Sequence, residues 1–310
     1  MSDLPLRSPP GVGARLLLVL LSLAWGLSWP AVRIALDEVA PWTLRALSYG
    51  VGSVFLFVFL RLTGRKASLP FGPVYVHVIV SALLNVAGFG LITTFAQLNS
   101  LTSRVVIVSY SMPVWASLMA WLILGERLNV VSIIGLVLCV SGLAVLVYPV
   151  MSSDAAVGLL LALIAALCWA TGTIYVKWAQ IPGDGIVITA WQLVVAFVVT
   201  ATGVAAFEGV PHLWPLSLPV IAALAFHGPI GTGVAYFLWF TIVGRLPAVT
   251  ASLGALLTPV VGIVSTVLLV GERLTFADAI GFLLIFAAAA SVLLQRAGQQ
   301  SPITPPGREG

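Results

Sequence analysis

The chain has 310 residues, of which 60% are hydrophobic and only 8% are charged. Soluble domains carry roughly 25% charged residues, so this chain lacks the polar surface that a water-soluble enzyme, a disordered protein or a nucleic-acid binder needs. The net charge of +4 reflects a few basic loop residues and scarce acids. Cys139 and Cys168 lie in apolar runs and indicate buried thiols without a disulfide. The composition therefore predicts an all-α integral membrane protein.

Ten apolar runs are each long enough to cross a bilayer, which takes about 20 helical residues. They cover 15–36, 43–61, 73–98, 103–124, 130–149, 157–178, 186–206, 216–243, 248–270 and 276–295. The connections between them are too short to hold a soluble domain. The first run is predicted to span the membrane and not to be a signal peptide, because no clean small-residue cleavage site follows it. A short disordered tail is predicted from Gln299 to Gly310.

Basic residues predict the orientation of these helices. With the N-terminus in the cytoplasm, ten of the 14 Lys and Arg residues fall on the cytoplasmic side and four on the outer side. This bias predicts a multi-pass protein of the plasma membrane (the inner membrane of a bacterium) with both termini cytoplasmic. Trp42, Trp178 and Trp214 fall at the ends of runs, which is typical of interfacial anchors.

The two halves of the chain share a motif. Gly125-Glu126-Arg127-Leu128 recurs 146 positions later as Gly271-Glu272-Arg273-Leu274, and we interpret both turns as helix caps with local ion pairs. The match divides the chain into units of five runs, residues 1–150 and 151–310. Because five is odd, the second unit must be inverted relative to the first. Inverted repeats are typical of transporters that bind their substrate near the bilayer midplane.

Two tandem five-helix units resemble the EamA domains of the drug/metabolite transporter superfamily. The resemblance covers nearly the whole chain and rests on three features, which are Ala24-Trp25-Gly26-Leu27-Ser28, Arg45, and the stretch Pro113 to Arg127 that recurs as Pro259 to Arg273. It implies export of amino acids, other metabolites or drugs. The aromatic-rich helices are most similar to YddG-like exporters of aromatic or neutral amino acids.

Charged residues narrow the class of substrate. All ten acidic residues fall in loops, in tails or at helix ends. A proton-coupled exporter of cations usually needs a carboxylate at mid-membrane. A carrier of phosphate esters needs Arg or Lys deep in its cavity, whereas Arg33, Arg45, Arg104 and Lys177 are predicted near helix ends. The substrate is therefore expected to be neutral or zwitterionic, with a sizeable apolar part.

A few polar and aromatic residues fall deep within the runs and form the predicted substrate site. Aromatic rings hold apolar groups, or an ammonium through cation–π attraction worth about 0.5–2 kcal/mol. Amide and imidazole groups can bond a carboxylate or an ammonium. Helix packing is the alternative role for each residue. The predicted substrate-binding residues are Trp25, Asn85, Tyr110, Trp115, Trp169, Gln192, His227 and Trp239.

Pro113 and Pro259 are also 146 positions apart, in the fourth and ninth runs. Each proline removes a backbone donor and bends its helix, so together with Gly231 they are predicted to shape or gate the cavity. Tolerated kinks and close packing are the alternatives. His227 is the one candidate for proton coupling, because an unperturbed histidine titrates near pH 6.5. Otherwise, transport is expected to be uncoupled.

The sequence thus predicts a secondary transporter that exports neutral, large or aromatic amino acids and related metabolites by alternating access. Its predicted partners are the small-molecule substrate and the lipid bilayer, with no nucleic acid and no obligate protein partner. No cofactor and no metal are expected, and no cluster of acids, histidines or cysteines indicates an enzyme. A multidrug exporter of aromatic cations, a membrane enzyme and a non-transporting scaffold are the alternatives.

Overall fold

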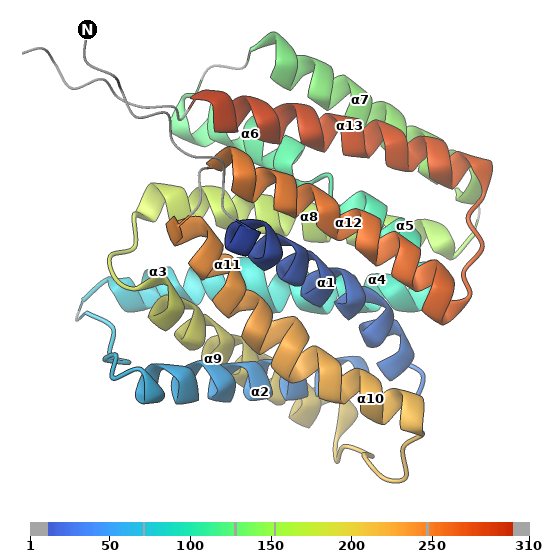
Figure 1. Cartoon of the computed structure of the whole chain (residues 1–310). Coiled ribbons are helices and arrows are strands. Elements are labelled where there is room, and N and C mark those ends of the chain that lie inside the picture. Colours follow the sequence, from blue (N-terminus) through green and yellow to red (C-terminus); the bar gives the residue numbers. More distant parts are fainter. Residues whose placement is uncertain (1–11, 71, 127–128, 152, 246–247, 300–310) are drawn as a thin grey trace, which may run out of the picture.

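The computed structural model describes residues 12–70, 72–126, 129–151, 153–245 and 248–299, and these ranges form helices and no β-strand. The helices lie side by side in one bundle, with the connections at its two ends (Figure 1). In chain order they are α1 (Val12–Ala35), α2 (Pro41–Leu62), α3 (Val74–Ser81), η1 (Ala82–Gly88), α4 (Phe89–Asn99), α5 (Thr102–Ser109), α6 (Met112–Leu124), α7 (Val130–Val147), η2 (Tyr148–Val150), α8 (Ala155–Ala179), α9 (Gly185–Gly203), η3 (Val204–Glu208), α10 (Leu218–Phe226), η4 (His227–Val234), α11 (Ala235–Arg245), α12 (Ala248–Val270) and α13 (Phe276–Gln299).

These helices account for the ten predicted crossings. Within the described ranges, nine helical segments are long and apolar enough to cross a membrane, and α12 contributes the shorter apolar helix Leu256–Val270. Three crossings consist of several helices, namely α3–η1–α4, α5–α6 and α10–η4–α11. The chain is therefore a multi-pass membrane protein. The predicted tail beyond Gln299 lies outside the described residues.

Successive crossings run in opposite directions, so the connections gather at two ends of the bundle. We call the end where α1 begins the near face; it carries the connections 63–73 and 180–184. The opposite end is the far face, with the connections 36–40 and 209–217. In Figure 1 the near face is on the left and the far face is on the right.

Carboxylates from distant parts of the chain cap two helices at the far face. Glu208 accepts hydrogen bonds from the backbone N–H (2.8 Å) and the hydroxyl (2.7 Å) of Thr43, in the first turn of α2. Glu272 accepts bonds from the backbone N–H groups of Thr102 (2.6 Å) and Ser103 (2.9 Å), in the first turn of α5. The first N–H groups of a helix have no intrahelical partner, and the helix dipole favours negative charge there.

The repeated Gly-Glu motif has different contacts in the two halves. Glu272 caps a helix, as expected, although the helix is the distant α5. The expected local ion pair is wrong, because no ion pair of the described residues includes Glu272. Its counterpart Glu126 accepts a hydrogen bond from Lys177 at the near face, and Arg127 lies outside the described residues. What the two turns share is a left-handed backbone at Gly125 and Gly271, with φ of 68° and 76°. Glycine adopts this conformation without steric cost, so both helices can end there.

Further polar contacts tie the far face together. Arg104 on α5 pairs with Asp278 on α13, with 2.6 Å between Nε and Oδ1, and both side chains are largely buried. Glu38 accepts a bond from the backbone N–H of Ser217, at 2.8 Å. Hydrogen bonds from the side chain and the backbone of Ser217 hold the pKa of Glu38 below its usual value. Hydrogen bonds and an ion pair thus join segments of the far face that are distant in sequence.

Replacing Glu272 with alanine is expected to lower the unfolding temperature of the purified protein. The substitution removes the capping carboxylate of α5, and the loss of a cap costs about 0.5–2 kcal/mol. Asp154→Ala is the control, because the side chain of Asp154 makes no capping hydrogen bond although it precedes α8. Thermal melts in detergent, followed by tryptophan fluorescence, measure both. Equal melting temperatures for the two variants would contradict the capping role.

Candidate functional site

A cavity of about 570 Å³ lies inside the bundle, and helices from both halves of the chain line it. Most of its wall is apolar, with a few polar side chains set into it. This combination is typical of a site that binds a small organic molecule.

Aromatic rings form two groups in the cavity wall. Trp25 of α1 packs against Trp239 and Tyr236 of α11, with ring centroids 5.6 and 6.0 Å away. Phe89 of α4 packs edge-on against Trp169 of α8, at 4.8 Å. Each group holds its rings in fixed orientations, because offset and edge-to-face contacts stabilise the pairs by about 0.5–1.5 kcal/mol beyond burial. The wall can therefore receive an apolar or aromatic group of a ligand.

The cavity brings together most of the residues that the sequence singles out. The predicted substrate residues that line it are Trp25, Asn85, Tyr110, Trp169, Gln192, His227 and Trp239. The predicted hinge residues Pro113, Pro259 and Gly231 line it too. Trp115 is placed elsewhere: it packs beside Val114 and Cys139, and its indole N–H donates to Ser111 Oγ at 2.9 Å. Apolar residues surround Trp115 on all sides of α6 in the sequence, so no pattern indicates which face of the helix its ring occupies.

The two matched prolines occupy different backbone settings. Pro113 stands in the first turn of α6, directly after the break between α5 and α6. Proline is well tolerated there, because the first helical N–H groups have no partner in any case. Pro259 lies inside the continuous helix α12. The expected pair of symmetric kinks is therefore not seen, although both residues reach the cavity.

Two π-helices flank the cavity at matching positions of the two halves. A shift of 146 residues carries η1 (Ala82–Gly88) onto 228–234, and η4 spans His227–Val234. Asn85 and Gly231 correspond in this alignment. π-helices are rare and occur frequently at functional sites, since the wider turn disrupts the regular backbone ladder. The Oδ1 atom of Asn85 is buried and has no hydrogen-bond partner in the described part of the chain.

Arg45 is the main lining residue whose position the sequence predicted wrongly. Its backbone lies near the start of α2, close to the far face, as expected. Its side chain, however, is buried, with 8% exposed, and lines the cavity. Its Nε donates to Thr94 Oγ1 at 2.5 Å, and its Nη1 lies 3.3 Å from His227 Nε2. Sequence position locates the Cα atom only, and the long arginine side chain reaches inward from there. The argument that the cavity holds no deep basic group is therefore wrong.

The groups around Arg45 can be assigned as hydrogen-bond donors or acceptors. The hydroxyls of Thr93 and Thr94 donate to backbone carbonyls of α4, Thr94 to Gly90 O at 2.7 Å, so their lone pairs face the guanidinium. An arginine can only donate, so the Nε2 atom of His227 accepts and the ring is neutral, with its proton on Nδ1. That buried Nδ1 has no partner within the described ranges.

Other lining residues were missed although signals for some of them were present. Trp29 lies one helical turn after Trp25 on α1 and packs against Phe89, with centroids 6.5 Å apart. Its spacing of four residues from Trp25 predicts the same helix face. Tyr49 lies one turn after Arg45 and donates to the carbonyl of Val86 in η1 at 2.8 Å, which no local pattern indicates.

The two ends of the cavity differ in exposure. Toward the far face the lining ends at buried side chains, Val32, Gln97 and Ile107, which are 1–2% exposed. Toward the near face it reaches Thr173, which is exposed, and Ile181, which is partly exposed. The cavity is therefore closed toward the far face and accessible from the near face.

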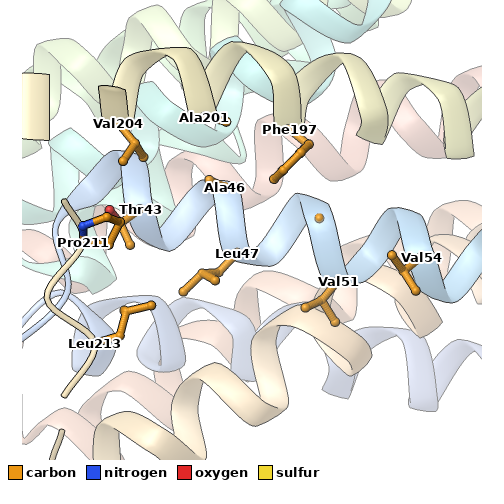
Figure 2. Close-up of a pocket in the computed structure, with 11 residues that line it drawn as sticks. Thr43, Ala46, Leu47, Val51, Val54, Phe197, Ala201, Val204, Pro211 and Leu213 are labelled. Atoms are coloured by element: carbon orange, nitrogen blue, oxygen red, sulfur yellow. The ribbon is translucent and has the colours of Figure 1, made fainter. Parts of the chain in front are cut away.

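A second hollow, of about 510 Å³, lies on the outside of the bundle (Figure 2). It runs between α2 and α9, and the loop carrying Pro211 and Leu213 closes one end. Val51 and Val54 on its floor are 45% and 62% exposed, as expected for side chains that face lipid. The hydroxyl of Thr43 is already bonded to Glu208. The interior cavity is the better candidate site, because polar side chains in its wall can bond a ligand.

The sequence profile of the EamA-like transporter family matches residues 13–148 and 156–294. The chain belongs to this family. Two similar proteins of Bacillus subtilis (strain 168) are named as uncharacterized transporters: YvbV is 29% identical over 96% of both chains, and YoaV is 27% identical over 86% of this chain and 92% of its own.

A protein of Escherichia coli (strain K12), named "Probable amino-acid metabolite efflux pump", is 24% identical to this EamA-family chain over 87% of it and 91% of its own length. A crystal structure of a protein with 22% sequence identity matches with a TM-score of 0.65, over 94% of this chain and all of that one. At this identity the likeness shows a shared fold.

Replacing Gly231 with alanine is expected to destabilise the protein by about 1–3 kcal/mol, the usual cost of overpacking. A Cβ atom here would collide with Ser28 Oγ and lie 2.9 Å from His227 Nδ1. Gly228→Ala in the same π-helix is the matched control, because its Cβ would meet only the Val51 side chain, at 3.3 Å. Thermal melts in detergent measure the difference. A Gly231→Ala variant as stable as Gly228→Ala would contradict this account.

Proposed function

We propose that this transporter exports neutral, large or aromatic amino acids and related metabolites from the cell by alternating access. The observation that carries the proposal is the aromatic-walled cavity, which is closed toward the far face and accessible from the near face. An aromatic or branched side chain fits against rings, and the few polar groups are available for the charged end of an amino acid. The name of the Escherichia coli relative agrees with this substrate class.

An inverted repeat of residues 1–150 and 151–310 supplies the mechanism in this proposal. It is supported by the two profile matches, 13–148 and 156–294, and by the matched positions of η1 and η4. Two related halves can exchange roles, so that the closed far face opens while the near face closes. Pro113, Pro259 and Gly231 are the proposed flexible points.

The alternative of a cation exporter is less well supported. No carboxylate stands among the described residues that line the cavity, whereas a buried arginine does. A positive group in the wall repels a cationic substrate. The neutral state of His227 beside Arg45 also favours uncoupled transport over proton carriage by this histidine.

The proposed orientation has both termini in the cytoplasm of a cell bounded by this membrane, the inner membrane in a bacterium. The near face is then cytoplasmic, and the structure corresponds to an inward-accessible state. This orientation rests on the excess of basic residues on the near side.

Replacing Trp25 or Trp169 with alanine is expected to weaken the apparent affinity for an aromatic amino acid by about tenfold, which corresponds to roughly 1.4 kcal/mol of lost ring contacts. Counterflow of labelled phenylalanine into proteoliposomes preloaded with neutral amino acids measures this. Trp121→Ala is the control, because Trp121 lies on the lipid-facing side of α6 and is 46% exposed.

Unchanged counterflow in both cavity variants would refute the aromatic site. Stronger counterflow in vesicles loaded with flat quaternary dyes would favour the cation exporter.

Cysteine labelling tests the accessible face. In a background with Cys139 and Cys168 replaced by alanine, Ile181→Cys is expected to react with an impermeant maleimide only from the near face. Ile107→Cys is expected to react much more slowly than Ile181→Cys, because it is 1% exposed at the closed end. Labelling in right-side-out and in inside-out vesicles shows from which side of the membrane each cysteine reacts. Labelling of Ile107→Cys from outside the cell, with Ile181→Cys protected, would contradict the inward-accessible state.

A further inference from the structure

The guanidinium of Arg45 is buried in the cavity wall, and the described part of the chain supplies no counter-anion to it. The ion pairs of the described residues join Arg33 to Asp37, Arg65 to Asp184, Arg104 to Asp278 and Lys177 to Glu126. Glu208 and Glu272 are held by helix N-termini at the far face. Among the described residues, every close contact of Arg45 is with a neutral group instead, which leaves its positive charge without a counter-ion there.

Neutral partners satisfy hydrogen bonds but do not balance a charge. Removing an ion from water costs several kcal/mol even after relaxation, and a nearby opposite charge is what usually offsets this cost. The threonine hydroxyls and His227 hold the guanidinium in one place, with Nη2 lying 3.5 Å from Thr93 Oγ1. A rigid, charged donor that lines a cavity is prepared for an anionic group of a ligand.

We propose that Arg45 binds the carboxylate of the transported molecule, with His227, Thr93 and Thr94 as positioning residues. The inference rests on the proposed function and names the group that every substrate must carry. A guanidinium bonds both oxygens of a carboxylate through parallel N–H groups, and such charge-assisted bonds are roughly twice as strong as neutral ones. The aromatic rings of the same cavity then receive the rest of the molecule.

The rest of the cavity lining selects among anions. Arg45 is the one lysine or arginine among the described lining residues, so the site offers a single positive charge. That charge balances a monocarboxylate but not a phosphate dianion. No carboxylate stands among the described lining residues, so the wall does not require an ammonium on the substrate. Aromatic monocarboxylates are therefore expected as substrates whether or not they carry an amino group.

Counterflow of labelled phenylalanine tests this selection with analogues loaded inside the vesicles. L-Phenylalanine and 3-phenylpropionate are expected to drive uptake. L-Phenylalanine amide and phenethylamine, which lack the carboxylate, are expected to be weaker by at least about tenfold, and phenyl phosphate likewise. Amide or amine exchange equal to that of phenylalanine would overturn the inference, as would a preference for phenyl phosphate.

The Arg45→Gln variant tests whether Arg45 causes the preference for substrates that carry a carboxylate. The ratio of phenylalanine to amide exchange is expected to fall about tenfold or more and to approach one, with partial recovery in Arg45→Lys. Arg33→Gln, an exposed arginine paired with Asp37 at the far face, is the matched control and keeps the wild-type ratio. A wild-type ratio in a folded Arg45→Gln variant would overturn the inference. If Arg45→Gln does not fold, Arg45→Lys and Thr94→Val are compared by the same ratio, and an unchanged ratio in both overturns it.

Binding of 3-phenylpropionate to the purified protein, followed by tryptophan fluorescence, separates this inference from the proposed function. One outcome is that the protein exchanges no substrate but binds 3-phenylpropionate, and that this binding is lost in Arg45→Gln or weakened in Arg45→Lys. That outcome would refute the transport activity and support the carboxylate site. Exchange of neutral amino acids without any dependence on Arg45 would support the transport activity and refute the carboxylate site.

Discussion

One buried guanidinium connects three helices around the interior cavity. Arg45 extends from the first turn of α2 and bonds to Thr94 on α4 and His227 on η4, so three segments that are distant in sequence meet at one end of the cavity. The charge is costly to bury, and the surrounding neutral acceptors fix its position without removing that cost. This contact places a positive charge in a cavity wall whose other described side chains are neutral.

The two faces of the bundle are held together by different kinds of contact. At the far face, carboxylates cap helix N-termini and the pair Arg104–Asp278 is largely buried. At the near face the pairs Arg65–Asp184 and Lys177–Glu126 are exposed. Exposed ion pairs contribute about 0–1 kcal/mol, whereas capping bonds to buried N–H groups contribute more.

Related elements of the two halves have diverged in detail. η1 and η4 keep their register and both reach the cavity, yet one presents Asn85 where the other presents Gly231. Pro113 begins a helix, whereas Pro259 lies within one. Identical motifs therefore do not make identical contacts, because each helix meets a different set of neighbours. The cavity between the halves is asymmetric, with its charge on one side.

The sequence by itself determined the membrane class, the ten crossings and the matched positions of the two halves, because these depend on the length, hydropathy and spacing of segments. It also indicated three of the four tryptophans that line the cavity, Trp25, Trp169 and Trp239, since they fall deep within apolar runs. Only the tertiary structure decided that Arg45 enters the cavity, that Trp115 does not line it and that Glu272 caps the distant α5. Those outcomes depend on where a side chain points and which helix lies beside it, and both are set by packing between segments far apart in the chain.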